Sequence, residues 1–463
     1  MKRRFRGIDR VHFIGIGGVG MCGIAELLHG LGYTISGSDL AEGSTVERLR
    51  GLGIHVVTGH AETNVGAADV VVVSSAIRAN NPEIAEAARR GIPVIPRAEM
   101  LAELMRLQDG IAVAGTHGKT TTTSLIAHVL EHAGLDPTAV VGGRIAGAGE
   151  RTGARLGQGA FLVAEADESD GSFLRLAPVI AVITNVEPEH LDHYGTEEAL
   201  QDAFVQFANR VPFFGVCVVC LDHPGVQELL PRLTRRRSTY GFSPQAEWGA
   251  GEPEFHVDGA RFEVRHGEQT LGPIDLPLAG RHNVLNALAA IAVAGEAGVS
   301  FERTSEALAS FPGVERRFET KGEVAGIRVI DDYGHHPTEI LATLAAARGV
   351  HSGRLVVVFQ PHRYSRTRDL FEDFAAAFHE ADLVWVTEIY AAGETKLPGI
   401  EGESLADAVR ARGHRDVRFA ADLATLPDRL VPELRAGDWV LTLGAGDITR
   451  LGPRLLAALE ARA

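Results

Sequence analysis

Short apolar runs alternate with helical stretches through most of the chain. Between residue 11 and about residue 107 the runs are VHFIGI, GYTISGSD, IHVVTG, DVVVVSSAI and IPVIPR. Each is strand-length and bounded by glycine or polar residues, which is typical of buried parallel strands. We predict a doubly wound, Rossmann-like α/β domain over residues 1–107.

The alternation restarts twice. A second series runs through GIAVAGTHGKTTT, FLVAEADESD, VIAVITNVEPEH and FGVCVVCLD to an apolar helix over HNVLNALAAIAVAGEAG. Residues 243–276 interrupt it, and there we expect a small antiparallel insertion. After FPGVERRFE the pattern returns in IRVIDDYGHHP, LVVVFQPHRYSRTRD, LVWVTEIY and DWVLTLGAGD. We predict a central P-loop ATPase-like parallel sheet over 108–311 and a Rossmann-like domain over 312–463, so that three α/β domains account for the 463 residues.

The segment AGTHGKTTT has the features of a phosphate-binding loop between a strand and a helix. Its glycines let backbone N–H groups approach phosphates, Lys119 can bridge the outer phosphates, and Thr120 can offer a hydroxyl to Mg²⁺. Val113 stands where the usual motif has its first glycine, so the loop is a shorter variant. Lysine occurs only at positions 2, 119, 321 and 396, which makes Lys119 hard to explain as a surface residue.

Two further strand ends carry metal-binding residue types. Glu165 ends one apolar strand in EADESD, and His190 lies just beyond another in TNVEPEHLDHY. Taken singly, the acidic run reads as a solvated loop and His190 as a helix cap. Beside a phosphate loop, we favour Mg²⁺ binding by Thr120, Glu165 and His190.

The segment GIGGVG matches the dinucleotide fingerprint GxGxxG. Gly15, Gly17 and Gly20 follow a strand, and Asp39 ends the next strand, where an acidic residue can bind a ribose hydroxyl. NAD and a UDP-sugar both present a diphosphate and a ribose, so this motif alone leaves an oxidoreductase and a sugar-nucleotide enzyme open. The triphosphate site argues against simple hydride transfer.

Composition and charge exclude several classes of protein. The net charge of −15 disfavours nucleic-acid binding. No apolar run reaches the ~18 residues that span a bilayer, and we expect no membrane insertion and a cytoplasmic location. Cys217 and Cys220 have CxxC spacing, but without a second pair we interpret them as part of a buried strand.

Together these motifs resemble the Mur ligases of peptidoglycan synthesis. The resemblance covers essentially the whole chain, and DDYGHHPTE and FQPHRYSRTRD are similar to the alanine-adding branch. It implies an ATP-dependent amide ligase that joins L-alanine to the carboxylate of UDP-N-acetylmuramate through an acyl phosphate, with ATP and Mg²⁺ bound by a monomer or weak homodimer.

The resemblance also implies roles for residues. Those implied in catalysis are Lys119, His190, Arg317 and His335. Those implied in ATP binding are Gly115, Thr116, His117, Gly118, Lys119, Thr120, Thr121, Asn283, Asn286, Arg317 and Asp332. Those implied in UDP-sugar binding are Gly15, Gly17, Gly18, Gly20, Asp39 and Ser74. Tyr333, His335, Arg363 and Arg366 would bind the amino acid, since arginine forks suit carboxylates.

Three alternatives stay open at this point. The recycling ligase that attaches a tripeptide to the same sugar nucleotide would share the first two domains. A nicotinamide-dependent oxidoreductase with an accessory ATP site, or a non-catalytic nucleotide-binding regulator, would share single motifs only.

Overall fold

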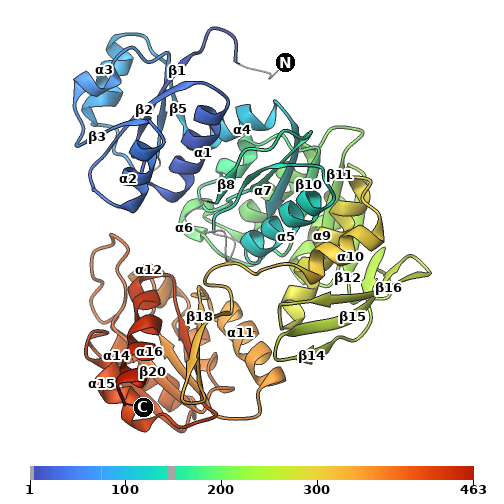
Figure 1. Ribbon diagram of the computed structural model, residues 1–463, viewed down its shortest axis with the longest axis vertical. Coiled ribbons are helices and arrows are strands. Elements are labelled where there is room, and N and C mark those ends of the chain that lie inside the picture. Colours follow the sequence, from blue (N-terminus) through green and yellow to red (C-terminus); the bar gives the residue numbers. More distant parts are fainter. Residues whose placement is uncertain (1–4, 75, 144–152, 463) are drawn as a thin grey trace. The chain divides into compact units, whose positions relative to one another are not determined.

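The computed structural model describes residues 5–74, 76–143 and 153–462. The chain divides into two compact units. The first holds the residues up to Gly251 with Glu263–Ile274 and Leu285–Phe311, and the second holds Glu252–Phe262, Asp275–Val284 and Pro312 onward. Within the described ranges the strands form three sheets, and helices connect them (Figure 1). The predicted α/β class is confirmed.

The N-terminal sheet has the order β3-β2-β1-β4-β5 and is parallel throughout. Its strands are β1 Arg10–Ile14, β2 Thr34–Asp39, β3 His55–Thr58, β4 Val70–Val73 and β5 Val94–Pro96. Its helices are α1 Val19–Gly30, α2 Ser44–Gly51, η1 Glu62–Val65, α3 Pro82–Arg89 and α4 Arg97–Met105. Because β1 lies between β2 and β4, the strand order reverses there, and the loop after β1 lies where doubly wound sheets bind ligands.

The central sheet has the order β14-β15-β13-β12-β11-β10-β6-β9-β7-β8, with β16 paired to β15. Its strands are β6 Asp109–Ala114, β7 Thr138–Val140, β8 Ala154–Arg155, β9 Phe161–Glu165, β10 Ile180–Ile183, β11 Val216–Cys220, β12 Arg237–Gly241, β13 Trp248–Ala250, β14 Glu254–His256, β15 Gly259–His266 and β16 Gln269–Leu276. Strand β6 is parallel to both β10 and β9, so the loop after β6 is again at a reversal of strand order.

The segment 243–276 is part of this sheet. Strand β13 continues the parallel order beside β12, and β15 then pairs antiparallel with β13 and β14. The expected antiparallel strands are present, and they extend the sheet at its edge.

Eight helical segments accompany the central sheet in the part of the chain that the structure describes. They are α5 Lys119–His132, η2 Ser172–Arg175, α6 Leu191–Tyr194, α7 Glu197–Asn209, α8 Pro224–Leu229, η3 Leu230–Arg232, α9 Arg281–Glu296 and α10 Phe301–Ala309. Helix α5 begins directly at the phosphate loop. Its Leu125, Ile126, Val129 and Leu130 are fully buried. Each such side chain contributes about 1.5–3 kcal/mol to holding the helix against the sheet.

The C-terminal sheet has the order β17-β18-β22-β19-β20-β21. Its strands are β17 Glu319–Val324, β18 Ile327–Asp332, β19 Leu355–Phe359, β20 Leu383–Thr387, β21 Val417–Ala420 and β22 Trp439–Leu443. Its helices are α11 Pro337–Val350, α12 Tyr364–Asp369, α13 Phe371–Ala376, α14 Gly402–Ala411, α15 Leu426–Leu430, η4 Val431–Glu433, η5 Asp447–Arg450 and α16 Leu451–Arg462. Only β17 is antiparallel among these described pairings, so the carboxyl ends of the other five strands share one edge.

The cysteines are structural. Cys217 and Cys220 lie on the fully buried strand β11, as predicted, and Cys22 is buried on α1. Burial raises the pKa of Cys217 to about 12 and that of Cys220 to about 11. Among the described helices, none is long and apolar enough to cross a membrane.

Candidate active site

The glycine loop of the N-terminal sheet follows β1. Gly15 has φ +78° and its N–H donates to the Ser38 carbonyl at 2.8 Å. The Gly17 N–H donates to Asp39 Oδ2 at 2.8 Å, so the carboxylate predicted to bind ribose is held beside the loop. A Cβ on Gly15 would lie 3.4 Å from the Ser74 Cβ. The structure therefore brings Gly15, Gly17, Asp39 and Ser74 together.

The start of α1 has a cationic neighbour that the sequence analysis did not identify. Gly18 is the N-cap of α1, and Gly20 lies in its first turn. A Cβ on Gly20 would lie 2.6 Å from Arg97 Nη1. The Arg97 guanidinium and the positive end of α1 together favour an anion at this loop.

The phosphate loop of the central sheet joins β6 to α5. Gly115 has φ +133° and Gly118 has φ +81°, which are backbone conformations that favour glycine. A Cβ on Gly118 would lie 2.7 Å from Asn286 Oδ1, and Thr122 donates to the same oxygen at 3.1 Å. Asn286, a predicted ATP contact on α9, thus packs directly on this loop.

The strand end after β10 holds the loop backbone from the other side. Asn185 accepts a hydrogen bond from the His117 N–H at 2.7 Å and donates to the His117 carbonyl at 3.0 Å. Thr184 donates to that carbonyl at 2.6 Å. The sequence TNVEPEH was singled out for His190, whereas its first two residues shape the phosphate loop.

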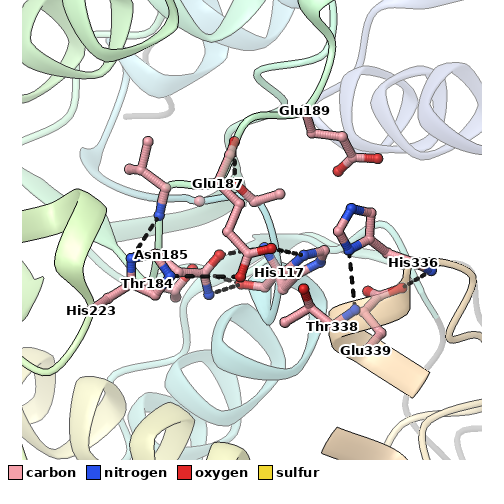
Figure 2. A network of polar contacts seen from close by, with 12 residues as sticks. His117, Thr184, Asn185, Glu187, Glu189, His223, His336, Thr338 and Glu339 are labelled. Carbon is pink, nitrogen blue, oxygen red and sulfur yellow. Dashed lines mark hydrogen bonds and ion pairs between the residues drawn. The ribbon is translucent and has the colours of Figure 1, made fainter. Parts of the chain in front are cut away.

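The same strand end carries an acidic residue between two histidines. Figure 2 shows Glu187 with His117 Nε2 at 3.4 Å from Oε2 and His223 Nε2 at 3.6 Å from Oε1. The Glu187 N–H also donates to Thr116 at 2.9 Å. Thr116 and His117, both predicted ATP contacts, are therefore fixed by the strand end after β10.

Lys119 is bound within the loop by three acceptors. Its Nζ donates to the carbonyls of Gly115 at 2.6 Å and Thr116 at 3.0 Å, and to Glu168 Oε1 at 2.8 Å. Burial alone would lower the Lys119 pKa, but Glu168, Asp167 and Glu165 together raise it, so the ammonium stays charged. The predicted phosphate-binding lysine is thus a half-buried cation at the start of α5.

Glu168 is a site residue that the sequence analysis did not identify. It is 2% exposed, and its Oε2 is buried with no hydrogen-bond partner among the described residues. Burial raises the pKa of Glu168 to about 7, although Lys119 acts in the opposite direction. An ionised Glu168 is tolerated here because Lys119 is its partner.

Glu168→Gln is expected to remove a pH dependence of stability. The folded carboxyl keeps its proton up to about pH 7, and the unfolded carboxyl only up to about 4.5. The folded state therefore binds more protons between these values, and the free energy of unfolding falls as pH rises through them. The shift corresponds to about 3 kcal/mol. Urea unfolding of both proteins at about pH 5 and about pH 8 measures the difference, and an identical pH dependence would contradict the assignment.

Two of the three predicted magnesium ligands, Glu165 and Thr120, offer oxygen atoms, and the third, His190, offers an imidazole nitrogen. Glu165 ends β9 beside β6, and its Oε1 accepts from the Gly142 N–H at 2.8 Å. Thr120 is buried in the first turn of α5. His190 is the N-cap of α6 with φ +59°, and its Nε2 lies 3.8 Å from Glu189 Oε2. The Glu165 carboxylate at the end of β9 and the Thr120 hydroxyl in the first turn of α5 offer the oxygen ligands that Mg²⁺ prefers.

The second unit holds Asp332 at the end of β18. Its two carboxylate oxygens accept from the backbone N–H groups of Phe318 and Gly334, each at 2.7 Å. Burial raises the Asp332 pKa, against the effect of Arg317. Arg317 also lies over the Tyr333 ring at 5.2 Å. The structure therefore brings three predicted residues together here.

Helix α9 begins next to this cluster in the second unit. Burial and Arg317 lower the pKa of His282 to about 4, so this imidazole is neutral. The adjacent Asn283 is buried and donates to the Ala279 carbonyl at 2.8 Å. Asn283 is thus held in the first turn of α9.

His335 and helix α11 form the other side of this edge. His335 Nδ1 lies 3.1 Å from the Tyr333 carbonyl and 3.5 Å from Glu339 Oε2. His336 and Glu339 form the capping box that starts α11, in which the Thr338 N–H donates to His336 at 3.3 Å (Figure 2). His335, which was predicted to be functional, is thus positioned directly before the cap of α11.

Two further predicted residues, Arg363 and Arg366, follow β19, and Thr121 is buried in the first turn of α5. Arg363 is exposed, and Arg366 lies in the short helix α12.

Two glycine loops in the first unit and a polar strand edge in the second define a nucleotide-dependent enzyme of the doubly wound type.

The chain belongs to the Mur ligase family. The catalytic domain of the family matches residues 10–109, the middle domain matches residues 113–294, and the glutamate ligase domain matches residues 316–446. The predicted family and its three-domain architecture are confirmed.

Several relatives with similar sequences carry one name. The UDP-N-acetylmuramate--L-alanine ligase of Anaeromyxobacter dehalogenans strain 2CP-C is 56% identical over 97% of this chain and 98% of the relative. The protein of that name from Sorangium cellulosum is 56% identical over 99% and 98%. Among solved structures, the UDP-N-acetylmuramate-alanine ligase of Thermotoga maritima has a TM-score of 0.83 at 30% identity, covering 98% of this chain and all of that one. A murein peptide ligase from Psychrobacter arcticus has a TM-score of 0.70 at 27% identity over 98% and 99%.

Proposed function

We propose that this protein joins L-alanine to the carboxylate of UDP-N-acetylmuramate at the expense of ATP. The observation that carries the proposal is the 56% identity, over 97% of this chain, to a relative with that name. The half-buried Lys119 at a glycine loop agrees with it, because a ligase of this class must hold the phosphates of ATP. The product is a precursor of peptidoglycan.

The chemistry proceeds in two displacements. A carboxylate oxygen of the sugar nucleotide attacks the γ-phosphorus of ATP, and ADP leaves. The amine of L-alanine then attacks the carbonyl carbon of the acyl phosphate, and phosphate leaves as the amide forms. The enzyme binds the two anions and the amine in a reactive orientation, so the reaction no longer depends on rare encounters in solution.

In this proposal each residue acts by charge and position. Lys119 and Arg317 bind the phosphates, where their charge stabilises the transferring group. Asp332 binds the ribose of ATP, and Asn283 and Asn286 the adenine. His335 accepts the proton that the amine of alanine loses. Thr120 and Glu165, with His190, would hold Mg²⁺, which would supply charge neutralisation on the phosphate oxygens.

Phosphate release tests the proposal and separates it from the recycling ligase. The pure protein is incubated with ATP, Mg²⁺ and UDP-N-acetylmuramate, together with either L-alanine or the tripeptide. We expect phosphate release with L-alanine and not with tripeptide alone. Release only with the tripeptide would replace our choice by the recycling activity, and bound NAD(P) without phosphate release would favour an oxidoreductase.

The proposal includes a cellular location and an oligomeric state. The substrates and products are small molecules found in the cytoplasm, where we place the protein. A monomer or weak homodimer suffices, because the chain carries every proposed residue. The boundaries 1–107, 108–311 and 312–463 stay predictions.

A further inference from the structure

Four aromatic side chains form a row at the carboxyl edge of the sheet in the second unit. Tyr333 and His335 follow β18, with ring centroids 5.3 Å apart. His362 follows β19 and lies 5.7 Å from His335. Tyr390 follows β20 and stacks on His362 at 5.5 Å with an interplanar angle of 11°. Because these parallel strands end at one edge, the row continues directly from the predicted amino-acid residues to Tyr390.

Tyr390 belongs to a segment, residues 388–394, that is tied to the loop carrying the arginines. The Tyr390 N–H donates to the Pro361 carbonyl at 2.8 Å, and the Arg363 N–H donates to the Tyr390 carbonyl at 2.9 Å. Glu394 accepts from the Ser365 hydroxyl at 2.6 Å and from its N–H at 3.0 Å. The position of Tyr390 is therefore coupled to that of Arg363.

Arg363 is held in a backbone conformation that is unfavourable for a residue with a side chain. Its φ is +70° and its ψ is 137°. Such strain persists where surrounding contacts enforce it, and it concentrates at functional sites. The bond to Tyr390 provides one such contact, and Thr367 provides others, because its N–H and hydroxyl donate to the Arg363 carbonyl at 3.2 Å and 2.8 Å.

The ring of Tyr390 is fixed on two sides and open on the rest. His362 covers one face of the ring, and a Cβ on Gly446 would lie 2.7 Å from Tyr390 Cγ. The residue is still 39% exposed. No hydrogen bond to its hydroxyl occurs among the described residues, so the ring presents a rigid, largely apolar surface beside the arginine loop.

We propose that Tyr390 is a specificity-determining residue whose ring limits the side chain of the incoming amino acid. This inference rests on the proposed function, in which Arg363 and Arg366 bind the carboxylate of L-alanine. An arginine fork fixes the amino acid at its carboxylate, and a rigid ring beside the fork leaves space for a methyl group and excludes a branched side chain.

The test compares L-alanine with L-valine in the wild type, Tyr390→Ala and Tyr390→Phe. Phosphate release with ATP, Mg²⁺ and UDP-N-acetylmuramate gives kcat/KM for each amino acid. For Tyr390→Ala we expect the ratio of L-valine to L-alanine to rise by about 10–100-fold, the scale of discrimination that a hydrophobic wall provides. Tyr390→Phe, which keeps the ring, should leave the ratio at its wild-type value. The KM for ATP serves as a control for general damage and should not change.

Each outcome decides the inference. An unchanged ratio in Tyr390→Ala overturns it while the proposed function stands. An equal rise in Tyr390→Phe also overturns it, because the hydroxyl would then be responsible. If the wild type itself shows no turnover with L-alanine, the proposed function fails and this inference fails with it.

Discussion

Lys119→Ala should lower kcat for phosphate release by at least about 10²–10³-fold, the loss typical when a preorganised donor to a developing charge is removed. The ammonium is the cation at the start of α5, and its carbonyl partners Gly115 and Thr116 belong to the phosphate loop itself. No neutral side chain can replace that charge on a triphosphate. Steady-state phosphate release at saturating substrates measures the effect, and near-normal activity would show that the loop does not bind the phosphates of ATP.

Lys119→Ala should also lower the stability of the protein, and the size of the loss should depend on pH. Without Lys119, Glu168 is buried and unpaired, and breaking such a pair costs about 3–5 kcal/mol unless the carboxyl takes up a proton. The melting temperature should therefore fall more at about pH 8 than at about pH 6, and adding Glu168→Gln should recover most of the loss. Lys321→Ala, which removes an ion pair with Glu319, is the matched control and should leave turnover unchanged.

Gly118→Ala should raise the KM for ATP by about two orders of magnitude. The residue has φ +81°, and an added Cβ would lie 2.7 Å from Asn286 Oδ1. The methyl group must therefore displace either the loop or the asparagine, and a shift of about 1 Å at a positioned group can cost about 100-fold. ATP titration of the initial rate measures the change.

Gly134→Ala separates this effect from backbone strain. Gly134 follows the far end of α5, has φ +79°, and an added Cβ there meets nothing within 4 Å. Both substitutions pay a similar conformational cost, of the order of 1 kcal/mol. Only the one in the phosphate loop should change the KM. A similar rise in both variants would show that general destabilisation is the cause.

The strands and the loops of this protein were predictable because their signals are local. Runs such as VVVV and LVVVF are buried β-strands, and the first three glycines of GIGGVG and both glycines of GTHGK occupy the turns that follow β1 and β6. The site residues lie at the carboxyl edges of the sheets, and the parallel order of the strands alone predicts this position. Local sequence signals were therefore enough to predict the fold and the position of both glycine loops.

The identity of the buried carboxylate was not predictable from the run EADESD. Glu168 is 2% exposed, whereas Asp167 is half-buried and Asp170 is exposed. The path of the chain between β9 and η2 decides which acidic residue points toward Lys119. A run of neighbouring acidic residues in the sequence does not reveal that path. The roles of Asn185 and Tyr390 are hidden for the same reason, because their partners are distant in sequence.

The burial of all three thiols has a practical consequence. Cys22, Cys217 and Cys220 have raised pKa values, so little reactive thiolate exists at neutral pH. Maleimide dyes should therefore leave the native protein unlabelled. A single cysteine introduced at Phe213, which is 87% exposed, would accept a fluorophore by itself, and no native cysteine would have to be removed first.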